Sequence, residues 1–224
     1  MKKIMFNDKY GLTKAVLEGR KSQTRRFIKL NANQYVRAVA LDNGSFFSYV
    51  AEPGKPSAFM GELELPEYDG ELSPAYFIGE EVAIAQSYRD IMRYYHSLGH
   101  VDTRKVSEQE LVFCNAMREF ESKGNDSAMR GDENKMFVRA DLMPHRIKIT
   151  HVRVERLQDI SDEDCLKEGI ICKNGRYRVE TNKGVVFYTT DARQAFAYLI
   201  DKVSGKGTWD SNPYVFVYDF ELVK

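Results

Sequence analysis

The residues with the most evident chemical potential lie together near the amino terminus. Residues 19–26, here called the basic segment, contain four cationic side chains and two hydroxyls. A hydroxyl can attack a carbonyl carbon, a nearby lysine can accept its proton or stabilise an oxyanion, and arginines can bind phosphate through paired N–H groups. The segment therefore predicts a catalytic or anion-binding loop, and a solvated basic turn is the alternative interpretation.

Two elements must position the basic segment, a helix before it and a strand after it. Apolar residues recur at helical spacing from Leu12 to Val16. Gly19 suits the end of that helix because glycine adopts positive φ values without strain. Residues 26–30 alternate in the way a strand does. The cations are therefore expected where helix meets sheet, close to helix-end carbonyl groups that favour positive charge.

A second short helix is predicted much later in the chain. Ser161 carries a hydroxyl suited to an N-cap, Asp164 occupies the reciprocal position of a capping box, and Gly169 suits the helix end. Glu168 therefore falls in the last turn of this helix. Asn-Gly and Asn-Lys-Gly sequences within 173–184 then predict a hairpin.

The region after the basic segment predicts strands and an irregular stretch. Strand-like residues flank an Asn-Gly turn within 42–45, which predicts a hairpin over 35–50. Residues 51–74 are rich in proline, glycine and acidic side chains, so little regular structure is expected there. A buried strand is expected at 82–85.

The middle of the chain predicts an inserted helical segment. Apolar residues mark one helix at 91–98, and a capping-box pattern precedes a second helix at 107–120. Residues 121–135 lack hydrophobic periodicity. Because no repeat and no linker separates two cores, we expect a single domain over 1–224 with a helical insertion at about 89–136.

The carboxyl-terminal third predicts the strongest strands. The apolar phase slips within 146–155, which predicts a bulge near 150–151. A helix is expected to begin at Thr190 or Asp191, since either side chain suits an N-cap. Residues 214–220 are apolar on both faces, which predicts a central strand.

The composition indicates a globular protein whose charges balance. Of 224 residues, 43% are hydrophobic, and 33 Lys and Arg match 33 Asp and Glu. The chain has no overall positive charge that would predict a nucleic-acid partner, so any anion site must be local. The three cysteines have no CxxC spacing, and neither a signal-peptide core nor a membrane-spanning stretch is present. We therefore expect a cytoplasmic protein without a membrane partner.

Metal binding is not expected from the histidines. His96 and His100 have i, i+4 spacing, but Gly99 interrupts the helix and no acidic third ligand is evident nearby. The sequence therefore predicts no metal and no cofactor.

The basic segment resembles the signature of the ASCH domain family, in which Gly-Arg-Lys, Ser or Thr, a further Thr and an Arg follow a helix. Other motifs of the family match in order at 78–82, 146–149, 154–164 and 168–170. Residues 205–214 resemble the closing motif of bacterial and phage-type members. The resemblance implies an α+β fold built on a closed or nearly closed PUA-like β-barrel. Helices would border the barrel, and the helical segment inserted in the sequence would lie outside it.

The same resemblance implies a catalytic set. Some small ASCH proteins are amidohydrolases that deacylate N4-acetylcytidine with a lysine, a threonine and a glutamate, and the matching residues are Lys21, Thr24 and Glu168. The threonine would attack the amide, the lysine would accept its proton or stabilise the oxyanion, and the glutamate would orient the lysine or shuttle the proton. Alternatively, Glu168 is a helix-end carboxylate paired with Lys21 or Arg25.

A binding function is the leading prediction, because RNA binding is the most general role proposed for the family. A local basic cleft would bind RNA, or a nucleotide or modified nucleoside. The candidate ligand-binding residues are Arg20, Ser22, Arg25, Arg26, Trp209, Asp210 and Asn212. A base can stack on the single tryptophan, although core packing is its commoner role. Its two polar neighbours can bind a base edge or cap a turn, and the arginines can equally be surface cations.

Two other functions stay open at this point. One is the amidohydrolase just described, and the other is a phage or mobile-element interaction protein in which the basic segment is structural. Loss of the acyl group from N4-acetylcytidine separates the enzyme from both alternatives.

Overall fold

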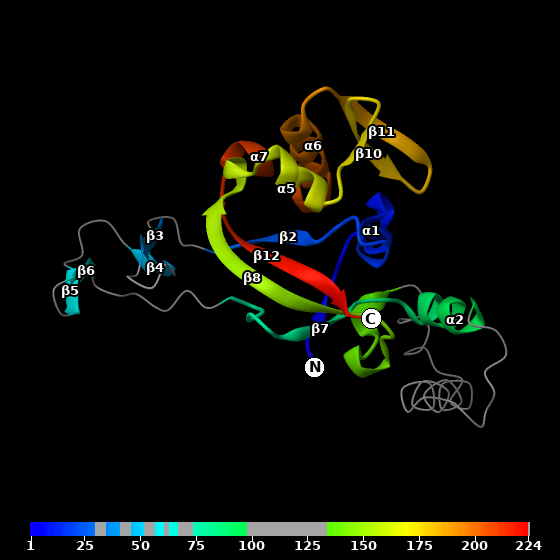
Figure 1. The fold of residues 1–224 in the computed structure, drawn as a ribbon, viewed down its shortest axis with the longest axis horizontal. Helices are drawn as coiled ribbons and strands as arrows, with labels where there is room; N and C mark the ends of the chain where they lie inside the picture. Colours follow the sequence, from blue (N-terminus) through cyan, green and yellow to red (C-terminus); the bar gives the residue numbers. More distant parts are fainter. Residues whose placement is uncertain are drawn as a thin grey trace.

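The computed structural model describes residues 1–29, 35–40, 46–51, 57–60, 63–66, 74–97 and 134–223. Figure 1 shows their course from β1 to β12. In chain order the elements are β1 (Lys3–Ile4), η1 (Asp8–Tyr10), α1 (Leu12–Leu17), β2 (Gln23–Phe27), β3 (Tyr35–Ala40), β4 (Phe46–Ala51), β5 (Ser57–Met60), β6 (Leu63–Pro66), β7 (Glu81–Ile84), α2 (Tyr88–Ser97), η2 (Lys135–Phe137), η3 (Ala140–Leu142), β8 (Arg146–Arg156), η4 (Leu157–Asp159), α5 (Asp162–Lys167), β9 (Ile171–Lys173), β10 (Arg176–Thr181), β11 (Gly184–Thr189), α6 (Ala192–Ser204), α7 (Thr208–Ser211) and β12 (Tyr214–Val223).

A five-stranded sheet positions the basic segment. Its order is β1-β7-β8-β12-β2, with β1 parallel to β7 and the other neighbours antiparallel. The final strand β12 lies between β8 and β2 and is buried from Val215 to Tyr218. The prediction of a central final strand is therefore confirmed. Its pairing with β2 holds Thr24 opposite Tyr218 and Arg26 opposite Phe216.

A bulge in β8 explains the slip in its apolar phase. The register changes so that Asp219 pairs with His151 while Phe220 pairs with Ile149, which leaves Thr150 as the extra residue. One extra residue reverses the side-chain alternation of a strand. Ile149 on one side of the bulge and Val152 on the other can therefore both pack into the main core. The predicted bulge is confirmed.

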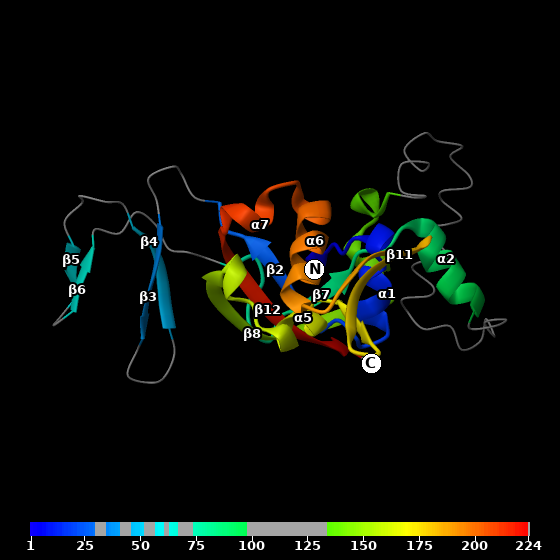
Figure 2. The same cartoon turned by 90° about the horizontal axis from the view of Figure 1, so that it is seen from above.

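Helices α5 and α6 cover one face of the five-stranded sheet, as Figure 1 and the turned view in Figure 2 agree. Two predicted helix starts are confirmed, because Ser161 accepts a hydrogen bond from Asp164 N–H and Asp191 accepts from Arg193 N–H. Asp164 does not complete the predicted capping box, since its carboxylate binds other partners. The three-stranded sheet, in the order β11-β10-β9, packs on the far side of α6.

The α+β architecture is confirmed, but the predicted closed β-barrel is not. Among the described residues, the sheets hold five and three strands, and two separate hairpins are formed by β3 with β4 and by β5 with β6. Strands β1 and β2 occupy the two edges of the five-stranded sheet. Because β1 spans only two residues, it offers little backbone with which to close the sheet onto β2.

Several local predictions have different outcomes. The strands predicted over 35–50 are confirmed as β3 and β4, but the turn at 42–45 lies outside the described residues. The expectation of little regular structure over 51–74 is wrong in part, because β5 and β6 pair within it. The strand expected at 82–85 is confirmed as β7.

The inserted segment is described only at its ends. The first predicted helix is confirmed as α2, which begins three residues earlier than the predicted residue 91. The second predicted helix and most of 121–135 lie outside the described residues. In the part of the chain that is described, no helix combines the length and apolar character needed to cross a membrane.

Two cysteines in the described residues should differ sharply in reactivity. Cys165 is fully buried in the main core, whereas Cys172 on β9 is exposed. Burial raises the pKa of the Cys165 thiol to about 12, and only a thiolate reacts readily with alkylating reagents. We expect iodoacetamide at about pH 8 to modify Cys172 and to spare Cys165 until the protein is unfolded. Peptide mass spectrometry measures this, and early modification of Cys165 would contradict its placement.

Candidate functional site

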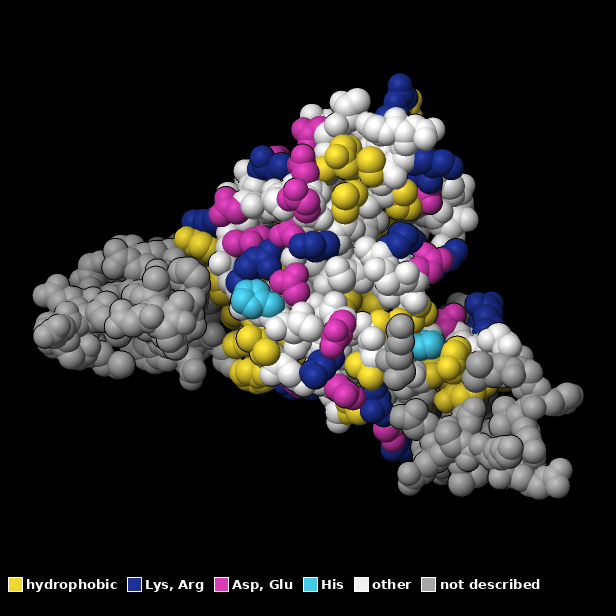
Figure 3. Space-filling model, viewed as in Figure 1, with side chains coloured by type: hydrophobic (Ala, Val, Ile, Leu, Met, Phe, Trp, Pro, Cys, Tyr) yellow, Lys and Arg dark blue, Asp and Glu magenta, His cyan; other side chains and the backbone are white. Residues whose placement is uncertain are grey.

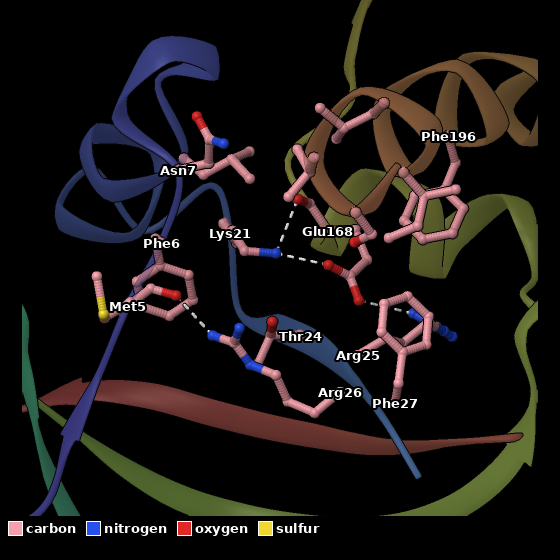
Figure 4. A pocket seen from close by; sticks show the side chains of 15 residues that line it. Met5, Phe6, Asn7, Lys21, Thr24, Arg25, Arg26, Phe27, Glu168 and Phe196 are labelled. Atoms are coloured by element: carbon pink, nitrogen blue, oxygen red, sulfur yellow. Dashed lines mark hydrogen bonds and ion pairs between the residues drawn. The ribbon is translucent and has the colours of Figure 1, made fainter. Parts of the chain in front are cut away.

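A pocket of about 350 Å³ lies where α1, β2, the end of α5 and α6 meet (Figure 4). Residues before and within β2 form its polar side, and Phe6, Leu12, Phe196, Leu199 and Ile200 supply apolar walls. Pockets of this size and mixed lining commonly bind small organic ligands. The pocket is therefore the candidate functional site.

The basic segment reaches the pocket by a tight turn that ends α1. Gly19 has the positive φ value of 73° expected of a helix-ending glycine. Ser22 N–H donates to Lys167 O at 3.0 Å, and Ser22 O accepts from Phe220 N–H at 2.9 Å. Strand β2 begins at Gln23, so the second half of the basic segment is strand and not the predicted loop. These backbone bonds fix the segment against both α5 and the central strand.

Lys21 and Glu168 meet in the pocket although they are far apart in the sequence. Lys21 Nζ lies 2.6 Å from Glu168 Oε2, and the two side chains are 2% and 7% exposed. Lys21 Nζ also donates to Gln23 O at 2.7 Å and to Glu168 O at 2.9 Å. These bonds occupy all the hydrogens of an ammonium group. The pair is a buried, fully hydrogen-bonded ion pair.

The chain after α5 approaches α1 closely because residue 169 is glycine. Its φ value is 107°, which side chains rarely adopt. A Cβ atom at this position would lie 3.1 Å from Leu12 Cδ2 and 3.7 Å from Lys21 Cδ. Gly169 therefore permits Glu168 to lie in direct contact with Lys21.

Arg25 binds the second oxygen of Glu168. Its NH1 donates to Glu168 Oε1 at 3.0 Å and to Gln23 Oε1 at 2.6 Å. Its Nε and NH2 donate to Glu155 Oε1 at 3.1 and 2.6 Å, and NH2 also donates to Asp164 Oδ2 at 3.3 Å. Every N–H of the guanidinium is therefore used within the protein.

A wider charged network surrounds Arg25, and the sequence did not reveal it. Arg153 donates to Glu155 Oε2 at 3.1 Å, to Asp164 Oδ2 at 2.6 Å and to Asp219 Oδ2 at 2.8 Å. Gln23 Nε2 donates to Asp219 Oδ1 at 2.6 Å. The available signal was Asp219, the one charged residue among the apolar positions 214–220 of the final strand.

Thr24 supplies a hydroxyl to the same pocket. It lies on β2, lines the pocket and is 5% exposed. Its hydroxyl makes no hydrogen bond to any residue that the structure describes. Figure 4 shows Thr24 beside Lys21, with Arg25 leaving the strand in another direction. The hydroxyl is therefore free to contact a ligand.

The remaining cations of the basic segment separate into two environments. Arg26 lines the pocket and donates from NH2 to Met5 O at 2.6 Å. Arg20 lies outside the pocket lining and pairs with Glu18 at 2.7 Å. Ser22 does not line the pocket either. Of the predicted ligand-binding residues in this segment, the structure places Arg25 and Arg26 at the pocket.

The predicted ligand-binding residues near the carboxyl terminus do not line the pocket. Trp209 packs against the main core and meets the Phe196 ring edge-on, with centroids 6.1 Å apart. Asn212 Oδ1 accepts from Gln158 N–H at 2.8 Å, as a turn-stabilising side chain does. Asp210 is exposed on α7. The structure therefore does not bring these three residues to Lys21 and Thr24.

Burial and the charged neighbours set the protonation of the pocket side chains. Burial lowers the pKa of Lys21 below its ordinary value, and the Glu168 carboxylate opposes that shift. Burial also disfavours the charge of Arg25, but the Glu168 and Glu155 carboxylates raise its pKa above the ordinary value. Lys21 is thus the pocket cation that can most readily lose a proton.

No metal-binding group of three or more His, Cys, Asp or Glu side chains occurs within the described ranges. His100 lies outside them.

No protein-family model, curated protein or solved structure matches the chain. The chemistry of the pocket is consequently argued from its own residues, which combine a free hydroxyl, a buried amine and a carboxylate that binds this amine.

Proposed function

We propose that the protein is an amidohydrolase that removes the acyl group from an N4-acylated cytidine or a similar small acylated nucleoside. The observation that carries the proposal is the free Thr24 hydroxyl in the same pocket as the buried Lys21 and Glu168 pair. The resemblance of the basic segment to ASCH amidohydrolases supports the same residues, and we extend the proposal to membership of that family, with its PUA-like fold and a cytoplasmic location.

The proposed reaction proceeds through an ester on Thr24. Thr24 Oγ1 forms a bond to the amide carbonyl carbon while its proton passes to the neutral amine of Lys21. The C–N bond then breaks, and the lysine proton passes to the leaving nitrogen. Water attacks the threonine ester and releases the carboxylic acid and the free hydroxyl. Glu168 holds Lys21 in place throughout, and accepts its hydrogen bond in both protonation states.

The contacts of the cations support a small ligand in preference to an RNA strand. The N–H groups of Lys21 and Arg25 are committed to protein acceptors, so a phosphate would have to displace a carboxylate from either side chain. On the face drawn in Figure 3, cationic and anionic side chains of the described residues are interspersed. Strand-length nucleic acid is instead bound by continuous basic surface.

A nucleoside-binding pocket without turnover is the second candidate. One observation favours it: Lys21 Nζ donates three hydrogen bonds, as an ammonium group does. An ammonium group cannot accept a proton. Under this alternative the buried pair is structural, and the free Thr24 hydroxyl binds the ligand.

The decisive experiment incubates the purified protein with N4-acetylcytidine and follows loss of the acyl group by liquid chromatography. We expect cytidine and acetate to form in equal amounts. Heat-unfolded protein provides the background rate. Binding of the nucleoside by native protein, without turnover above that background, would reject hydrolysis and leave the binding pocket.

The deacylation rate is expected to rise with pH through the pKa of Lys21. Burial lowers that pKa from the ordinary value of 10.5, although Glu168 opposes the shift. Only the neutral amine can accept the Thr24 proton, and its fraction grows as pH rises through the lowered pKa. The rising limb should therefore lie below pH 10.5. A kcat/KM profile that falls with pH from about pH 6 to about pH 10 would exclude Lys21 as the base.

A further inference from the structure

The charges around the pocket divide into a balanced network and one remaining cation. Four cations and four carboxylates are linked by ion pairs: Lys21, Arg25, Arg153 and Lys167 with Glu168, Glu155, Asp164 and Asp219. Their formal charges cancel. Arg26 lines the pocket but belongs to no ion pair with any described carboxylate. Counted over the described residues, the pocket therefore carries one uncompensated positive charge.

Arg26 also has unused hydrogen-bonding capacity. The only hydrogen bond of its side chain to a described residue runs from NH2 to Met5 O at 2.6 Å. Its Nε is buried and has no hydrogen-bond partner in the described part of the chain. Nε itself is shielded from the pocket, whereas NH1 donates to no described residue and is the group that an acceptor in the pocket can reach. An anionic oxygen is the best acceptor for a guanidinium.

Arg26 is placed so that one ligand can reach both it and Thr24. The two residues are separated by one position in β2, so their side chains leave the same face of the strand. Their backbone positions are about 7 Å apart by strand geometry. In Figure 4 the Arg26 guanidinium points toward Met5 and Phe6, away from the Arg25 and Glu168 pair. An anion bound there would sit at one end of the pocket, with Thr24 and Lys21 further along it.

We propose that Arg26 forms a subsite for an anionic group of the ligand, so that the preferred substrate is a small organic anion such as an acylated nucleoside monophosphate. This inference rests on the proposed function for the identity of the acyl group. The expected tighter binding of an anionic ligand does not require that the protein catalyses hydrolysis. A phosphate monoester and a carboxylate share the required chemistry, and both offer paired oxygens to an arginine.

The test measures binding in the absence of turnover. Isothermal titration of the Thr24→Val protein compares N4-acetylcytidine, its 5′-monophosphate and the matching 5′-carboxylic acid. We expect at least one anion to bind about tenfold or more tightly than the neutral nucleoside, as a charge-assisted hydrogen bond provides. Its affinity should fall as salt is added. The phosphate and carboxylate arms identify which anion the subsite prefers.

Variants of Arg26 assign the preference to this side chain. In the same background, Arg26→Gln should reduce the advantage of the anion to less than about twofold, whereas Arg26→Lys should retain part of it. Arg176→Gln is the matched control, because Arg176 is an exposed arginine on β10 outside the pocket lining. It should leave the preference unchanged.

The inference and the proposed function can fail separately. Equal affinities for the neutral nucleoside and both anions, or an anion preference that survives Arg26→Gln, would overturn the subsite even if the wild-type protein hydrolyses the amide. Conversely, an Arg26-dependent preference for the anion supports the subsite even if the wild-type protein hydrolyses nothing. Wild-type turnover of each ligand is measured in parallel for that purpose.

Discussion

Thr24→Val is expected to abolish deacylation while leaving the fold intact. Valine keeps the branched shape of threonine and lacks only the nucleophilic hydroxyl, so turnover should fall on the order of 10³-fold or more. The hydroxyl makes no hydrogen bond to a described residue, so its removal leaves no buried partner unsatisfied. Steady-state kinetics measures the loss, and circular dichroism and thermal unfolding check the fold.

Thr24→Ser is the matched control for this prediction. Serine restores the hydroxyl at the same position of β2, so measurable turnover should return. A hydroxyl is also present at Ser22, but Ser22 does not line the pocket, and Ser22→Ala should retain activity. Full activity in Thr24→Val would exclude Thr24 as the nucleophile.

The local features of the fold were predictable because each depends on a few neighbouring residues. The helix end at Gly19 follows from the conformational freedom of glycine, and the start of α5 follows from a single hydroxyl at Ser161. The bulge at Thr150 was visible because an extra residue must reverse the apolar alternation of β8. Such signals survive in any tertiary context that preserves the strand or helix.

The architecture of the sheet was less predictable, because closure depends on pairing between strands distant in sequence. The resemblance implied a barrel, but β1 contributes two residues and pairs with β7, and the described strands leave β1 and β2 at opposite edges. No local pattern in residues 3–4 specifies their partner. Edge pairing is therefore a property of the whole fold.

The candidate site was predictable only in part. Lys21 and Glu168 are 147 positions apart, and resemblance to a family, not periodicity, linked them. The pairing of Glu168 with Arg25 was one of the alternatives, but Glu155 and Asp164 were missed as partners of Arg25. Arg153 and Glu155, two positions apart in β8, resemble the solvated face of any strand. Only the register between β8 and β12 brings Arg153 to Asp219. Arg25, a predicted ligand-binding residue, is buried and binds Glu155, Asp164 and Glu168.

Glu168→Ala is expected to cause the largest loss of stability. The Glu168 carboxylate binds both Lys21 and Arg25, whose side chains are 2% and 1% exposed. Removing one member of a buried ion pair leaves an uncompensated charge and typically costs about 3–5 kcal/mol. We expect the free energy of unfolding to fall by about that amount in urea denaturation at neutral pH. Glu163→Ala, an exposed carboxylate on the same helix, should cost less than about 1 kcal/mol.

A second substitution tests whether the stability lost in Glu168→Ala comes from the Lys21 ammonium that is left without its carboxylate. Lys21→Met combined with Glu168→Ala removes the uncompensated ammonium, so the double variant should recover part of the stability lost in Glu168→Ala. Arg25 keeps Glu155 and Asp164 as partners in both proteins, and its contribution largely cancels in the comparison. If the double variant instead lost the sum of the stabilities lost in the two single variants, Lys21 and Glu168 would contribute to stability independently.

The pH dependence of Glu168→Ala provides an independent check of the same ion pair. Burial lowers the pKa of Lys21 below 10.5, and Glu168 opposes the shift, so removing Glu168 should lower that pKa further. Over a wider pH range, the unfolded variant then binds more protons than the folded variant. The free energy of unfolding of the variant rises with pH over that range. The deficit relative to wild type should therefore be fully present near neutral pH, where the wild type has the ion pair, and should shrink as pH rises through the folded-state pKa of Lys21. A deficit that stays constant up to pH 10.5 would mean that the stability of the pair does not arise from the charge of the buried amine.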